Sequence, residues 1–344
     1  MARSPESGPS EYVVGFDVGG TKTNVLNSDS DEVTRYTTAN FDSPYEVIDT
    51  YLSETEKHPA VVCLGMAAVR NSADGSMRLA KRGWPLFKPE EASERYGAKV
   101  VTANDMITTA AGIFEQDVET EPIKPGSPVE SDPTLVYAWS TGIGASLVVP
   151  SERNKYLPSA VGHAGLAPQH EDEVDYLRFV AKRHNGKLSI EFALAGEFGI
   201  DNLVDYYLEK NPDAMLDLYT LIAQDKAANV STGQVLVDVA RDGDSPAQAM
   251  AHKILNRLGG LLGYTLRNQV LAVQVGDIKM TGSVALSLAP YLAEHTSFIE
   301  RFVDQEARCA YIPEAIAIDL VKDPLVAVKG SLVLAEKELE RLNT

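Results

Sequence analysis

The sequence predicts an α/β protein built as two lobes with a cleft between them. In the first half of the 344 residues, short apolar segments alternate with helical segments, as in a sheet flanked by helices. A second series of apolar segments begins near residue 135, and each series contains its own glycine-rich turn. We expect a small lobe over residues 1–115, joined by the C-terminal helix at residues 321–344, and a large lobe over residues 116–320.

The first lobe begins with a predicted strand meander. The apolar run Tyr12–Asp17 is followed by glycines, by a second strand at Thr23–Leu26 and, after a polar turn, by a third strand at Val33–Thr37. The next expected elements are a helix at 44–52 capped by Ser43, strands at 60–64 and 99–102, and a helix at 105–114.

The second lobe combines a new group of strands with a long helical region. Residues 119–133 are rich in proline, glycine and acidic residues, which predicts a loop and a candidate hinge. Gly259, Gly260 and Gly263 lie in a long amphipathic helix expected at 247–268, where they indicate close packing. The other expected elements are strands at 135–139, 145–149, 275–280 and 315–320, a mainly helical region at 171–260 and a closing helix at 325–342.

Composition and charge exclude several classes of protein. The chain is 44% hydrophobic and 23% charged, as in globular proteins, and its net charge of -18 argues against nucleic-acid binding. No apolar run approaches the roughly 20 residues of a membrane helix, and residues 1–12 predict a short disordered leader rather than a secretory signal.

The cysteines and the acidic clusters also carry expectations. Cys63 and Cys309 are expected to be buried free thiols in a reducing cytoplasm. Acidic clusters such as residues 171–173 are expected to be solvated helix faces.

The first glycine turn, residues 17–23, has the composition of a phosphate-binding loop. Glycines let backbone amides approach phosphate oxygens, and threonines add hydroxyl donors. The turn is nevertheless not a P-loop, because Thr21 separates Gly20 from Lys22 and the residues that follow predict a strand rather than a helix. Taken alone, the same residues also fit an ordinary tight hairpin.

Two further turns favour a phosphate-binding role for the first one. Residues 140–144 join two apolar strands, and residues 281–284 follow a third strand and open a helix. This order of DxGGT, TGxG and TGS resembles the phosphate-1, phosphate-2 and adenosine segments of the actin, hexokinase and heat-shock ATPase superfamily. The resemblance implies a two-lobed actin-like ATPase (ribonuclease H-like) fold with an interlobe cleft, and ATP with Mg²⁺ as cofactors. It assigns nucleotide contacts to Asp17, Gly19, Gly20, Thr21, Thr141, Gly142, Gly144, Thr281, Gly282 and Ser283.

Carboxylates complete the predicted reaction centre. In the same resemblance, Asp17 holds Mg²⁺, through water because Mg²⁺ keeps much of its hydration shell. Asn104 and Asp105 follow a strand and open a helix, where a carboxylate can accept a proton from a substrate hydroxyl. Helix capping is the alternative role for this pair, since both residue types are favoured caps.

A longer stretch is similar to the bacterial glucokinase family, distinct from the repressor-type sugar kinases. It consists of residues 162–168, an acidic helix and residues 188–200, and the resemblance as a whole runs from about Tyr12 to Glu336. Carried over residue by residue, it makes Asp105 the general base and makes Asn104, His163 and Glu191 ligands of the sugar. Without that context, a lone histidine is more often a structural group.

The sequence departs from the family at two places. Ala160 stands where the family has a sugar-binding glutamate, with Val161 where it has a glycine, and residues 79–83 replace an asparagine-bearing polar stretch. Loss of a hydrogen-bonding carboxylate can change which sugar fits. With only two cysteines, the zinc site of the repressor-type kinases is absent.

The resemblance implies an ATP-dependent hexose kinase, with glucose as first substrate and glucose 6-phosphate as product. Another glucose-like sugar or a cyclitol is the alternative substrate, and a non-catalytic sugar sensor or an ATPase acting on a different substrate are the alternative functions. The family resemblance favours a cytoplasmic homodimer that acts on a small sugar or polyol, without nucleic-acid or membrane partners.

Overall fold

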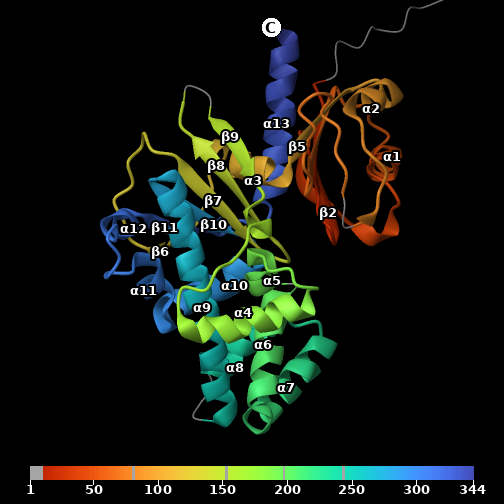
Figure 1. Ribbon diagram of the computed structural model, residues 1–344. Coiled ribbons are helices and arrows are strands. Elements are labelled where there is room, and N and C mark those ends of the chain that lie inside the picture. Colours follow the sequence, from red (N-terminus) through yellow and green to blue (C-terminus); the bar gives the residue numbers. More distant parts are fainter. Residues whose placement is uncertain (1–10, 80–81, 152–153, 197, 242–244) are drawn as a thin grey trace, which may run out of the picture. The chain divides into compact units, whose positions relative to one another are not determined.

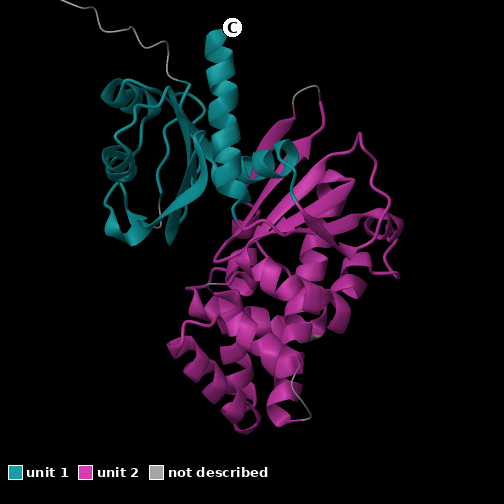
Figure 2. Cartoon of the chain, turned by 180° about the vertical axis from the view of Figure 1, so that it is seen from behind, with its two compact units in different colours: residues 1–118, 325–344 teal, residues 119–324 magenta. Residues whose placement is uncertain are grey.

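The computed structural model describes residues 11–79, 82–151, 154–196, 198–241 and 245–344 (Figure 1). The expected leader therefore lies almost wholly outside the described residues. The chain divides into two compact units, residues 1–118 with 325–344 and residues 119–324 (Figure 2). No helix in the described ranges is long and apolar enough to cross a membrane.

The first unit has a five-stranded sheet in the order β3-β2-β1-β4-β5. Its first three strands are the predicted antiparallel meander, and β4 and β5 run parallel to β1. The valines, Phe16 and Leu64 on β1 and β4 are fully buried, as expected for central strands covered on both faces. The strands are β1 Val13–Val18, β2 Lys22–Asn27, β3 Ser30–Thr37, β4 Val61–Met66 and β5 Lys99–Asn104.

Helices on this unit cover its sheet. Ser43 caps the first long helix by accepting from the Glu46 amide at 3.1 Å, as predicted. The final helix packs on β1, β4 and α3 (Figure 1). A short charged helix, α2, was not predicted. The elements are η1 Thr38–Asn40, α1 Pro44–Thr55, α2 Pro89–Tyr96, α3 Asp105–Glu115 and α13 Val326–Asn343.

The second unit has a six-stranded sheet in the order β6-β11-β10-β7-β8-β9. The prediction of a loop over residues 119–133 is wrong for its first part, because β6 pairs antiparallel with β11. The edge position of β6 tolerates Pro122, and buried Lys124 donates to the carbonyls of Pro125, Glu314 and Ile316. The strands are β6 Thr120–Lys124, β7 Thr134–Trp139, β8 Ile143–Val149, β9 Lys155–Ser159, β10 Asp277–Thr281 and β11 Ala317–Val321.

The rest of this unit is helical, as predicted. The glycines of α9 do mark a close approach: a Cβ at Gly259 would overlap Thr296, and one at Gly263 would overlap the Phe298 carbonyl at the start of α11. The elements are η3 Val161–His163, α4 Glu171–Arg183, α5 Ile190–Leu194, α6 Gly199–Lys210, α7 Pro212–Ala227, α8 Thr232–Arg241, α9 Pro246–Val273, α10 Ser283–His295, α11 Phe298–Val303 and α12 Tyr311–Ala315.

Two expectations about polar residues need correction. Glu173 is not on a solvated face: it is 2% exposed and accepts from the Gln169 amide at 2.8 Å, because it closes the first turn of α4 in a capping box. The second correction concerns the cysteines. Cys63 is buried as expected, and burial raises the pKa of its thiol to about 12. Cys309 is free but, contrary to the expectation, only partly buried.

Candidate active site

The first part of the site lies where β1, β4 and β5 end. Asp17 on β1 is in register with Gly65 on β4, and Met66 on β4 is in register with Asn104 on β5. These parallel strands therefore end at one edge of the sheet, with Asp105 directly after β5. The carboxyl edge of a parallel sheet is where α/β proteins place their ligands. Asp17 also accepts from the Asn24 side chain at 3.2 Å.

Asn104 and Asp105 both cap helix α3 at this edge of the sheet. The side-chain oxygen of Asn104 and one carboxylate oxygen of Asp105 each accept from the Met106 amide at 3.0 Å. The Asn104 amide group donates to the Ala68 carbonyl at 3.1 Å, which fixes its orientation. Capping of α3 thus does not depend on Asp105 alone, because the Asn104 side chain accepts a hydrogen bond from the same amide.

The pKa values of both carboxyls are raised, and the charge of Asp17 contributes to the shift of Asp105. Burial raises the pKa of Asp17 to about 6. Burial and then the nearby charge of Asp17 raise the pKa of Asp105 to about 7. A carboxylate with a pKa near neutrality is a better proton acceptor than one exposed to water. Two partly buried acids side by side are also a favourable setting for a divalent cation.

The metal-free protein is expected to gain stability when Asp105 is replaced by Asn. The folded-state pKa of Asp105 is raised, so ionising this carboxyl costs folding free energy; the cost is absent below about pH 4 and complete above about pH 7. Asparagine removes the charge and keeps an oxygen for the Met106 amide. We expect a gain on the order of 2 kcal/mol at about pH 8 and none at about pH 4, measured by urea unfolding in EDTA. A gain of equal size at both pH values would contradict this explanation.

The first glycine turn connects β1 to β2. The Gly19 amide donates to the Lys22 carbonyl at 3.0 Å, so Gly20 and Thr21 form a two-residue turn. A strand follows it, which agrees with the rejection of a P-loop. The carbonyl of Gly20 also accepts from the Arg82 guanidinium.

In the second unit, the two other glycine turns lie together. The side chains of Ser140 and Ser283 hydrogen-bond at 2.9 Å, which joins the β7–β8 turn to the start of α10. Gly282 has φ +102°, and a Cβ there would lie 2.5 Å from the Trp139 carbonyl oxygen. The Gly196 amide donates to the Ser140 carbonyl at 2.9 Å. Three separate segments thus meet at the end of β7, and they bring Thr141, Gly142 and Gly144 together with Thr281, Gly282 and Ser283.

Replacing Gly282 by Ala is expected to weaken nucleotide binding more than sugar binding. Alanine at φ +102° is strained, and its methyl group would displace the Trp139 backbone that carries the β7–β8 turn. We expect the Kd for MgADP to rise at least about tenfold, equivalent to about 1.4 kcal/mol, with a smaller change in sugar affinity. Isothermal calorimetry measures both. Unchanged MgADP affinity would separate this turn from the nucleotide site.

The predicted sugar ligands of this unit also lie together. His163 Nδ1 is 3.2 Å from a carboxylate oxygen of Glu191; the histidine is largely exposed and the glutamate largely buried. Glu191 stands in the first turn of α5, which Ser189 caps through the Phe192 amide. The Ile190 amide donates to the Ala164 carbonyl at 3.0 Å, and this bond holds the two segments side by side.

Packing also ties the His163 segment to the second glycine turn. A Cβ on Gly162 would overlap the carbonyl oxygen of Ile143 at the start of β8. Ala160 is exposed just before this segment and presents no hydrogen-bonding side chain. Of the replaced polar stretch before Trp84, residues 80 and 81 lie outside the described residues.

Sequence reasoning missed three members of these clusters. Ser140, Gly196 and Arg82 were not among the predicted site residues, although Ser140 belongs to the second glycine turn and Gly196 and Arg82 each contact a glycine turn. The close repetition of glycine in the segment around Gly196 was a usable signal. Nothing in the sequence paired Arg82 with Gly20, because 62 residues separate them.

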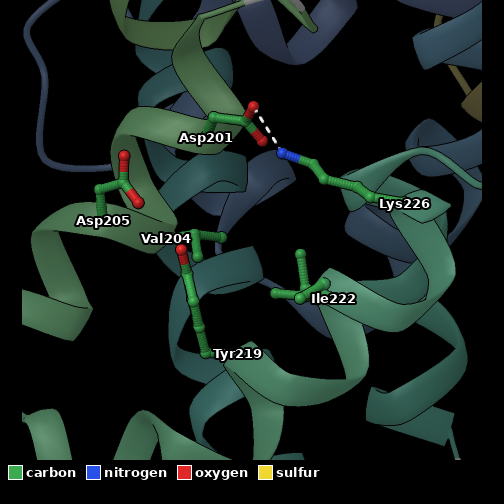
Figure 3. A pocket seen from close by; sticks show the side chains of 7 residues that line it. Asp201, Val204, Asp205, Tyr219, Ile222 and Lys226 are labelled. Carbon is green, nitrogen blue, oxygen red and sulfur yellow. Dashed lines mark hydrogen bonds and ion pairs between the residues drawn. The ribbon is translucent and has the colours of Figure 1, made fainter.

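A surface pocket of about 290 Å³ lies elsewhere, between α6 and α7 (Figure 3). Asp201 faces Lys226 across it at 2.8 Å. Its lining includes none of the predicted site residues, so we do not assign the reaction to it.

The two α/β units have the actin-like ATPase fold, and the chain is an ATP-dependent hexose kinase. The model of the glucokinase family matches residues 14–338, and the chain belongs to this family.

Relatives support the same assignment. A glucokinase of Nostoc punctiforme is 23% identical over 347 aligned positions, covering 93% of this chain and 98% of the relative. The glucokinase of Balamuthia mandrillaris in complex with glucose has a similar structure, with TM-score 0.75 and 18% identity over 94% of this chain and 93% of that chain. A ROK family glucokinase of Streptomyces griseus in complex with glucose and AMPPNP gives TM-score 0.64 and 16% identity over 95% and 99%. At these identities the two structures establish the fold.

Proposed function

We propose that this protein transfers the γ-phosphate of ATP to the primary hydroxyl of a hexose, with glucose as the first substrate and glucose 6-phosphate as the product. The observation that carries the proposal is the position of Asp105: a partly buried carboxylate next to Asp17, at the carboxyl edge of a parallel sheet, with a pKa raised to about 7. We also propose that the first unit acts as the small lobe of the kinase and the second as the large lobe.

In the proposed reaction, Asp105 accepts the proton of the sugar hydroxyl. The hydroxyl oxygen forms a bond to the γ-phosphorus, the bond from that phosphorus to the bridging oxygen breaks, and ADP leaves with the electron pair. Asn104, His163 and Glu191 orient the sugar by hydrogen bonds to its other hydroxyls. The orientation of His163 is favoured by its contact with Glu191. Positioning of this kind provides much of the rate in phosphoryl transfer.

The residues around Asp17 fit a magnesium ion that arrives with ATP. When bound, Mg²⁺ would neutralise charge on the phosphates. Within the described ranges, there is no cluster of three or more His, Cys, Asp or Glu side chains that could hold a metal ion. Mg²⁺ normally uses one or two carboxylates, water and substrate phosphates, so Asp17 acting through water meets its requirements.

The glycine turns supply the donors for the nucleotide. We assign the phosphates to Gly19, Gly20 and Thr21 in one unit, and to Thr141, Gly142 and Gly144 in the other. Thr281, Gly282 and Ser283 are assigned to the adenosine. Their backbone amides offer positive potential to the phosphates without added side-chain charge, which matters in a chain of net charge -18. We also propose a cytoplasmic homodimer, which sedimentation of the purified protein would test.

A coupled ADP-release assay tests the function. It uses MgATP with glucose, mannose, fructose, glucosamine, N-acetylglucosamine and a cyclitol. We expect turnover with glucose. Turnover with only another sugar of the panel would identify that sugar as the substrate. The change of substrate would then be attributed to the missing carboxylate at Ala160. Binding of a sugar by calorimetry without any turnover would replace the kinase by a sugar sensor.

A further inference from the structure

Arg82 holds a backbone carbonyl of the first glycine turn. Its Nε donates to the Gly20 carbonyl oxygen at 2.7 Å, and its Nη2 donates to the same oxygen. Arg82 is exposed and belongs to the segment 79–83, which differs from the family pattern. Hydrogen bonds from a charged guanidinium are stronger than those between neutral groups, so this contact is able to fix the carbonyl it reaches.

The hairpin itself does not fix the Gly20–Thr21 peptide group. Its neighbouring hydrogen bonds run from the Gly19 amide to the Lys22 carbonyl and from the Thr38 amide to the Thr21 carbonyl. Within the described part of the chain, no hydrogen bond of the Thr21 amide is found. A Cβ on Gly20 would meet nothing within 4 Å, so packing does not restrain this residue either. Among the described residues, the contact with Arg82 is therefore the hydrogen bond that restrains this peptide group.

The direction of that restraint matters for phosphate binding. A trans peptide group carries its C=O and its N–H on opposite sides, and the described chain has no cis peptide bond. When Arg82 draws the Gly20 carbonyl toward itself, the Thr21 N–H points away from Arg82. The reverse orientation would turn a carbonyl oxygen toward the side where the amide now points, and a carbonyl there repels phosphate.

We propose that Arg82 is a positioning residue for ATP: its guanidinium holds the Gly20 carbonyl and thereby presents the Thr21 amide to the nucleotide phosphates. The inference rests on the proposed function, in which this turn binds phosphate. It gives a role in nucleotide binding to a residue of the segment before Trp84, the segment that departs from the family pattern.

The test compares Arg82→Met, Arg82→Lys and the control Arg78→Met in the full-length chain. Methionine keeps the apolar stem and removes every donor, whereas lysine restores one charged donor. Arg78 is an exposed arginine just before this segment, and in the described part of the chain it has no hydrogen bond to the turn. The measurements are the Kd for MgADP by calorimetry, KM and kcat for MgATP and for the sugar, and the melting temperature.

For Arg82→Met we expect the Kd for MgADP and the KM for MgATP to rise about tenfold, the loss typical of a charged hydrogen bond. The KM for the sugar and the melting temperature should stay close to wild type. Arg82→Lys should recover part of the nucleotide affinity, and Arg78→Met should behave as wild type.

Two results would overturn the inference. One is unchanged nucleotide affinity in Arg82→Met. The other is an equal loss in Arg78→Met, since that would indicate a general effect of charge rather than the contact with Gly20. Failure of the proposed function gives a different result. If the wild-type protein binds MgADP but phosphorylates no sugar, the kinase proposal is wrong, and the MgADP affinities of the variants still test the role of Arg82.

Discussion

Replacing Asp105 by Asn is expected to lower kcat for sugar-dependent ADP release by about 10²- to 10⁴-fold, the usual contribution of general base catalysis. Asparagine cannot accept the proton of the sugar hydroxyl. It can still accept a hydrogen bond from the Met106 amide, so α3 should start at the same residue. The KM for MgATP and the Kd for the sugar should change much less than kcat. Stopped-time assays at saturating substrates measure the loss, and calorimetry measures binding.

Asp49→Asn is the matched control for this variant. Asp49 lies on α1, exposed, and forms an ion pair with Arg95 on the surface. Such exposed pairs contribute little to stability, so this variant should keep wild-type kcat. If Asp105→Asn kept more than about a tenth of the wild-type kcat, the base would have to be another group, because general base catalysis contributes at least about 10²-fold.

Replacing Gly330 by Ala is expected to cost about 2–3 kcal/mol of unfolding free energy, at the upper end for an overpacked core site. A Cβ on Gly330 would overlap the Thr108 carbonyl oxygen and lie 2.6 Å from the Gly112 amide nitrogen. Both are backbone atoms of α3, so neither can rotate away. Helices α13 and α3 would have to move apart, and α3 carries Asp105 as its first residue. Urea unfolding measures the cost, and kcat should fall with it.

Gly260→Ala in α9 is a suitable comparison. The nearest atom to a Cβ there is the hydroxyl oxygen of Ser297 at 3.2 Å, which belongs to a side chain that can rotate. Alanine also favours a helix over glycine by up to about 1 kcal/mol. Gly260→Ala should therefore be close to neutral. A similar loss in both variants would show that space near Gly330 is not the cause.

The elements that sequence predicted well have strong local signals. The meander of β1–β3 shows apolar runs and a polar turn, and Ser43 with Pro44 opens α1 in the usual order for a capped helix. Strand β6 lacks such a signal, because Pro122 and acidic residues resemble a loop and only pairing with β11 makes it a strand. Strand β9 combines Lys155 with Pro158 at an exposed edge, and its pattern is equally weak.

For the site, the chemical groups could be predicted from the sequence, but the contacts that hold them could not. The prediction joined Asn104 to Asp105 because they are adjacent, and a family pattern paired His163 with Glu191. The contacts of Gly196 with Ser140 and of Arg82 with Gly20 depend on how distant segments pack. No local propensity encodes such contacts, because they arise only when distant segments pack together in the fold.

The final helix has a consequence for biosynthesis. Helix α13 packs against β1 and α3, so the first unit buries one face of its sheet only after residues 326–343 have left the ribosome. The second unit is one continuous segment, residues 119–324, and can fold while the rest of the chain is still being made. The packing that supports the helix of Asp105 therefore forms only after the second unit has been synthesised. A nascent chain therefore has its glycine turns and Asp105 before α13 is available to support the helix that carries this base.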